Sequence, residues 1–120
     1  MLLAAAALAS LLALAHSYLG ERYILIRLFR GDGVPKLFGG TEFTQRTLRF
    51  AWHLTSLAWL SLAAILVKLS SHVPSRAELG MLLAGTFGVS GVVAFLGSRG
   101  RHLAWVVFLA IAVLAWLGAR

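Results

Sequence analysis

Four long stretches of this 120-residue chain carry almost no charge, and this pattern limits the folds open to it. They cover residues 1–19, 48–67, 79–98 and 103–119. A helix needs about 20 apolar residues to cross the hydrocarbon core of a bilayer. The chain is therefore predicted to be an all-α integral membrane protein, a four-transmembrane-helix antiparallel bundle that forms one domain over residues 1–120.

Composition agrees with an environment of lipid rather than water. Hydrophobic residues make up 60% of the chain and charged residues 12%, whereas a soluble domain this small needs many polar residues to cover its large surface. The absence of cysteine excludes disulfides, cysteine-ligated zinc and iron–sulfur clusters. The net charge of +7 does not indicate nucleic-acid binding, because the basic residues lie at the ends of apolar stretches, where Lys and Arg contact lipid headgroups.

Lys and Arg are divided unequally between the two sides of a four-span chain. Eight lie in or beside the first and third connections: Arg22, Arg27, Arg30, Lys36, Arg46, Arg49, Arg99 and Arg101. Only Lys68, Arg76 and Arg120 lie on the other side. Since cytoplasmic loops carry the excess of positive charge, we expect residues 20–47 to be cytoplasmic and both termini to be outside. The Ala, Leu and Gly content favours a bacterial inner membrane, with the termini in the periplasm.

The first apolar stretch and the segment after it each have two interpretations. Ala13-Leu14-Ala15 resembles a signal-peptide cleavage site, but no basic residue precedes the apolar run, so we expect a retained span. Over residues 21–30 apolar side chains alternate with arginines, which predicts a helix extension or a short interfacial helix. The glycines and proline of residues 31–35 are expected to end it.

The third stretch begins with a capping signal and is rich in small residues. Ser75 and Glu78 match the pattern S-x-x-E, so the third helix is predicted to start at Ser75. Small side chains allow membrane helices to approach closely. The expected packing positions are Gly80, Ala84, Gly85, Gly88 and Gly91. A helix that lines a narrow pore is the alternative interpretation.

Ionisable residues near the bilayer are costly and therefore informative. His16 and His53 are expected at similar depth near the cytoplasmic side, each on a stripe of its helix that faces inward. The candidate ligand-binding residues are His16, Glu21, Arg22, Arg49, His53 and His102. They either orient helices by hydrogen bonds, or bind haem, a quinone, a metal or a lipid headgroup, or relay protons.

These observations favour one function and leave two others open. We expect a non-enzymatic membrane protein that forms a homo-oligomer or joins a larger membrane complex. The first alternative is a ligand-binding protein that uses the layer of His16 and His53. The second is a small transporter or a membrane enzyme. No residue is assigned a catalytic role, and the pattern identifies no metal.

Overall fold

The computed structural model describes residues 1–120 and is helical along nearly the whole chain. The elements are α1 (Leu2–Leu19), the π-helix η1 (Gly20–Leu25), α2 (Ile26–Arg30), α3 (Glu42–Ser71), α4 (Arg76–Ser98) and α5 (Ala104–Ala119). The only β pairing is an isolated bridge between Leu37 and Gly40. The all-α prediction is confirmed.

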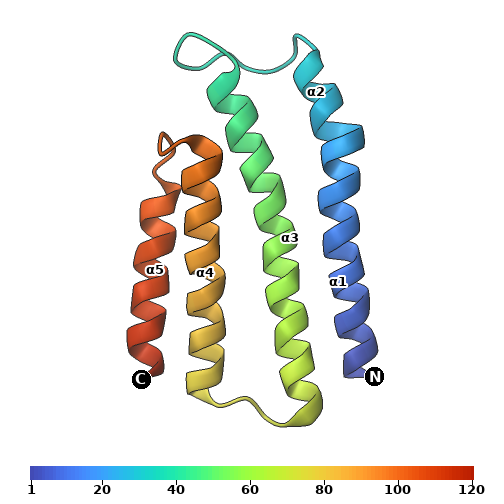
Figure 1. The fold of residues 1–120 in the computed structure, drawn as a ribbon, viewed down its shortest axis with the longest axis vertical. Coiled ribbons are helices and arrows are strands. Elements are labelled where there is room, and N and C mark those ends of the chain that lie inside the picture. The colour runs from blue at the N-terminus through green and yellow to red at the C-terminus, as the bar shows by residue number, and fades with distance from the viewer.

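The helices stand side by side in a single layer (Figure 1). Their order across the layer is α1, α3, α4, α5, and each runs antiparallel to its neighbour. The molecule measures 51 × 32 × 15 Å, so its shortest dimension is close to that of one helix with its side chains. The neighbours are antiparallel as predicted, but they form an open layer rather than packing around a shared interior. Only 12 of the 120 residues are buried, because each helix contacts others at its edges alone.

Three of the helices are long and apolar enough to cross a membrane. They are Leu2–Arg30, Glu42–Ser71 and Arg76–Ser98. The fourth, α5, is apolar but has 16 residues and is therefore about 24 Å long. Helix α3 begins six residues before the apolar stretch that predicted it. The ion pair between Arg46 and Glu42, four residues apart, supports this extra turn and a half of helix.

The first helix continues beyond its apolar stretch to Arg30, which confirms the predicted extension. The continuation passes through η1, where the backbone N–H of Ile26 bonds to the carbonyl of Glu21, five residues earlier. Gly31 then takes an extended conformation and ends the helix. As a result, Glu21 lies within the helical rod rather than in a loop, and its side chain is held against α3.

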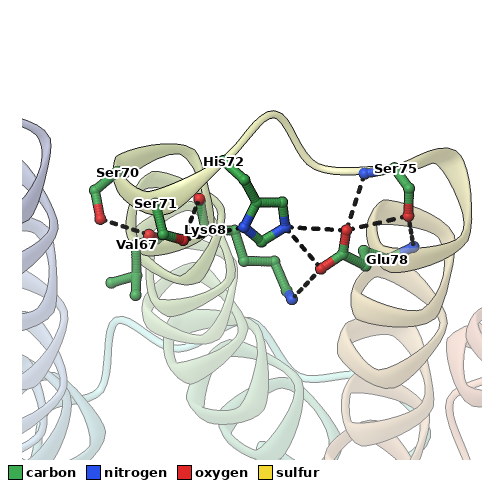
Figure 2. A network of polar contacts seen from close by, with 7 residues as sticks. All are labelled: Val67, Lys68, Ser70, Ser71, His72, Ser75 and Glu78. Atoms are coloured by element: carbon green, nitrogen blue, oxygen red, sulfur yellow. Dashed lines mark hydrogen bonds and ion pairs between the residues drawn. The ribbon is translucent and has the colours of Figure 1, made fainter.

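The connection between α3 and α4 is tied together by one carboxylate (Figure 2). Glu78 accepts hydrogen bonds from the backbone N–H of Ser75 at 3.0 Å and from Lys68 Nζ at 3.0 Å, and its Oε1 lies 3.0 Å from His72 Nε2. The Ser75 hydroxyl accepts from the Glu78 N–H, so the predicted capping box is confirmed. Glu78 precedes the apolar stretch 79–98. Its pKa is lowered to about 2, mainly by the hydrogen bond from the Ser75 N–H and then by the hydrogen bonds from Lys68 and His72.

The predicted packing positions of α4 differ in how closely α5 approaches them. A Cβ added to Gly80 would lie 2.6 Å from Ala119 Cβ, and one added to Gly91 would lie 2.7 Å from Leu109 Cδ2, so both glycines allow α5 to approach closely. Gly88 is looser, with Ala112 at 3.9 Å, and Ala84 is half-buried. Gly85 has nothing within 4 Å. Close approach to α5 therefore depends on two of the five predicted positions.

Candidate functional site

Polar side chains gather at the end of the layer that carries the connections 31–41 and 99–103. We call this the basic end, because eight of the eleven Lys and Arg residues lie there. Both termini and the α3–α4 connection lie at the opposite end (Figure 1). The basic end therefore holds the candidate site.

His53 on α3 is at the centre of a polar group that joins α3 to α1. Its Nδ1 lies 2.9 Å from the Ser17 hydroxyl, which donates a hydrogen bond to Ser56 at 2.8 Å. Its Nε2 lies 3.5 Å from a carboxylate oxygen of Glu21. Ser17 and Glu21 are four residues apart and so present their side chains on one side of the helix. Both ring nitrogens of His53 thus face protein partners.

Glu21 also holds Arg49 by two contacts. Arg49 Nε donates to one carboxylate oxygen at 3.1 Å, and Nη2 lies 3.0 Å from the other. Two-point pairs between Arg and a carboxylate fix direction as well as distance. The guanidinium carbon of Arg49 also lies 5.1 Å from the centre of the Phe29 ring. Arg49 is therefore held in place from the α1 side.

A second ion-pair group joins α3 to the end of α4. Arg46 Nε lies 3.0 Å from Glu42, and Arg46 Nη1 donates to the Gly97 carbonyl at 3.3 Å. Arg99 Nη1 contacts the same Glu42 oxygen at 3.2 Å. Glu42 lies before the apolar stretch of α3, and its pKa is lowered, first by the hydrogen bond from Arg46 and then by the charges of Arg46 and Arg99.

His16 belongs to a separate, aromatic group. Its ring stacks on Trp52 with centroids 4.4 Å apart and lies 4.8 Å from Trp59. The Trp52 indole N–H donates to the His16 carbonyl at 3.0 Å. A Cβ on Gly20 would overlap this indole, so glycine is required there. Trp52 and His53 are consecutive on α3 and point about 100° apart, so His16 has no contact with the group around His53.

Arg22 and His102 make no hydrogen bond or ion pair with Glu21, Arg49 or His53, although Arg22 lines a second cleft, of about 470 Å³, together with Glu21 and His53. The Arg22 guanidinium lies 5.9 Å from the ring of Tyr23 and is exposed. His102 Nδ1 accepts a hydrogen bond from the Ala104 N–H at 3.2 Å, which caps the start of α5. Of the six predicted site residues, Glu21, Arg49 and His53 are joined by direct polar contacts, and Arg22 lines a cleft with two of them.

A cleft of about 500 Å³ opens between α3 and α4 beside these residues. It is lined by Glu42, Gln45, Arg46, Arg49, Phe50 and His53 of α3 and by Val93, Leu96 and Gly97 of α4. Guanidinium groups and an imidazole in one cleft are suited to hold an anion. No group of three or more His, Asp or Glu residues lies close enough together to hold a metal ion.

Sequence reasoning missed two parts of this arrangement. Ser17 was not singled out, although its position one turn before Glu21 and its polarity within an apolar run were signals. Gln45 and Arg46 were not predicted to line a site, because they precede the apolar stretch that defined the second span. The cleft depends on which helix lies beside α3, and no local pattern contains that information.

Comparison with known proteins adds no identity to this geometry. No family model, no curated protein and no solved structure matches the chain.

Proposed function

We propose that this chain is a four-span protein of a bacterial inner membrane that acts by associating with itself or with a larger membrane complex, without catalysis. The main support for association is that the helices form a single layer. At 15 Å thick, the layer leaves a broad surface uncovered on both sides. One such side measures 51 × 32 Å, or about 1,600 Å², against about 800 Å² per partner in a standard protein interface.

Two further features support association within a membrane. Gly85 lies exposed on α4 with nothing within 4 Å, so a helix of another molecule can approach there closely. Helix α5 lies at the edge of the layer, and at about 24 Å it is shorter than a hydrocarbon core of about 30 Å. Oligomerisation is one way in which a short span accommodates such a mismatch.

The proposed topology places the basic end in the cytoplasm and both termini in the periplasm. Because the chain has no cysteine, single-cysteine variants report topology cleanly. Val73→Cys is expected to react with a membrane-impermeant maleimide on intact cells. Lys36→Cys is expected to react only after the membrane is permeabilised. Reversed labelling, or equal labelling of both variants on intact cells, would contradict the orientation.

Association is tested by native mass spectrometry of the full chain in a mild detergent and by crosslinking in membranes. A dimer or a higher oligomer, or a reproducible crosslinked partner, is expected. Gly85→Leu adds a bulky side chain to the uncovered side of α4, where nothing of the same chain lies within 4 Å of Gly85. Gly118→Leu is the matched change on α5. The first variant should weaken association more than the second. A monomer under all conditions, with no crosslinked partner, would refute the proposal.

A further inference from the structure

The cleft between α3 and α4 combines a cationic wall with an apolar wall. Arg46 and Arg49 line it from α3, three residues apart on one face of that helix, beside Glu42 and Gln45. Val93 and Leu96 line it from α4. A ligand that suits both walls carries an anionic group beside an apolar group.

The two guanidiniums keep most of their hydrogen-bonding capacity free of protein acceptors. An arginine has five N–H donors. Arg46 uses two of them, one on Glu42 and one on the Gly97 carbonyl. Arg49 also uses two, both on the carboxylate of Glu21. Three N–H groups of each arginine therefore remain for a ligand or solvent, while the ion pairs hold both side chains beside the cleft.

The charges around the cleft leave a surplus of one. Three guanidiniums, those of Arg46, Arg49 and Arg99, are joined by ion pairs to two carboxylates, those of Glu21 and Glu42. A phosphodiester carries a single negative charge and so brings this count to zero. Arginine matches phosphate oxygens with two parallel N–H bonds, which makes phosphate the anion best suited to the cationic wall.

We propose that this cleft binds a phospholipid. Its phosphodiester lies between Arg46 and Arg49, and its glycerol and first acyl carbons lie against Val93 and Leu96. The arginines stand at the start of the apolar part of α3, which is the depth of lipid headgroups if α3 spans a bilayer. The site rests on the proposed membrane location and is independent of self-association. His16 lies outside it.

Native mass spectrometry of the detergent-solubilised full chain tests the site with two lipids that share their acyl chains. Phosphatidylglycerol carries the phosphodiester, and diacylglycerol lacks it. The first is expected to bind at least about tenfold more tightly, since even one charge-assisted hydrogen bond to phosphate accounts for that ratio. Equal affinity for the two lipids would overturn the proposal, because the arginines would then not recognise phosphate.

Paired variants locate the binding. The double variant R46Q/R49Q is expected to lose at least about tenfold in affinity for phosphatidylglycerol. The control R27Q/R30Q removes the same charge from the same end of the molecule, outside the cleft, and should bind as the wild type does. Equal losses in both double variants would show a general effect of charge and would overturn the site.

A third variant separates the cleft from the ion pairs that its arginines make. Leu96→Trp leaves every charge in place and adds bulk to the apolar wall, and it should also weaken lipid binding, with circular dichroism confirming the fold. Unchanged binding in this variant would overturn the placement. Displacement of the lipid by millimolar inorganic phosphate would assign the cleft to a soluble phosphate instead. Oligomer masses in the same spectra report self-association separately.

Discussion

The two outer helix pairs of the layer are joined in different ways. Between α1 and α3 the contacts are directional. Trp52 donates a hydrogen bond to the His16 carbonyl, and the Ser17 hydroxyl bridges His53 and Ser56. The Glu21 carboxylate forms an ion pair with Arg49. Between α4 and α5 no side-chain hydrogen bond is present, and closeness comes from small residues, aliphatic side chains and aromatic rings.

This difference shows two ways of fixing neighbouring apolar helices. Lipid supplies no hydrophobic force between helices, so either close packing or polar contact must supply the specificity. The α4 and α5 helices meet through shape, and their polar contacts lie in the connection, where Trp105 donates to the Gly100 carbonyl and the Ser98 hydroxyl accepts from the His102 N–H. The α1–α3 pair depends on specific hydrogen-bond donors and acceptors, which set the register of the two helices and also position charged groups at the cleft. Three substitutions test this distinction, and a fourth tests the polar connection between α3 and α4; they run from the largest expected effect to the smallest.

Gly20→Ala should cause the largest loss. The added Cβ overlaps the Trp52 indole, and that ring is held in place by its hydrogen bond and by the stacked His16. We expect the free energy of unfolding, measured in detergent and monitored by circular dichroism, to fall by about 3 kcal/mol. Gly118→Ala is the matched control, since nothing lies within 4 Å of it, and alanine should leave stability unchanged or slightly higher. Equal stability of the two variants would contradict the close fit at Gly20.

Gly91→Ala should cost less, about 1–2 kcal/mol in the same unfolding measurement. Its Cβ meets the end of the Leu109 side chain at 2.7 Å, and an aliphatic end group can move where a bonded indole cannot. Gly88→Ala tests the shape argument on the same helix. Its nearest neighbour, Ala112, lies 3.9 Å away in ordinary contact, so stability should hardly change. A larger loss at Gly88 than at Gly91 would mean that α5 packs differently.

Trp52→Phe isolates one directional contact of the α1–α3 pair. Phenylalanine keeps an aromatic ring beside His16 but removes the N–H that donates to the His16 carbonyl. The loss should be about 1 kcal/mol, the net value of a typical hydrogen bond. Trp59→Phe is the control, because the Trp59 indole makes no hydrogen bond to the protein while also lying beside His16. Comparable losses would mean that ring packing, rather than the donor, matters at both positions.

Glu78→Gln should have the smallest effect at neutral pH, because Lys68 and His72 are partly exposed to solvent and ion pairs in contact with solvent contribute little. Its pKa is lowered from 4.5 to about 2, so the ionised carboxylate stabilises the fold above pH 4.5 and this contribution is lost as the pH falls towards 2. The melting temperature of the wild type should drop over that range by more than that of Glu78→Gln. The Asp32→Asn variant, which loses no ion pair, should follow the wild type.

The sequence by itself determined the features that depend on neighbours along the chain. The four apolar stretches became helices, Ser75 and Glu78 formed the capping box, the first helix ran on to Arg30, and the basic residues gathered at one end. Each follows from periodicity, capping or charge within a few residues, so each was readable without knowing the partner helix.

Only the tertiary structure decided how the helices are arranged and what their polar residues meet. Four apolar helices can close around an interior or lie in a row, and their hydropathy is the same in both cases. His16 and His53 were predicted at one level, but the turn of about 100° between Trp52 and His53 sends them to different partners. Gly20 resembled one small residue among many until the indole beside it was known. Such contacts join residues more than thirty positions apart, and no local pattern encodes which of them will meet.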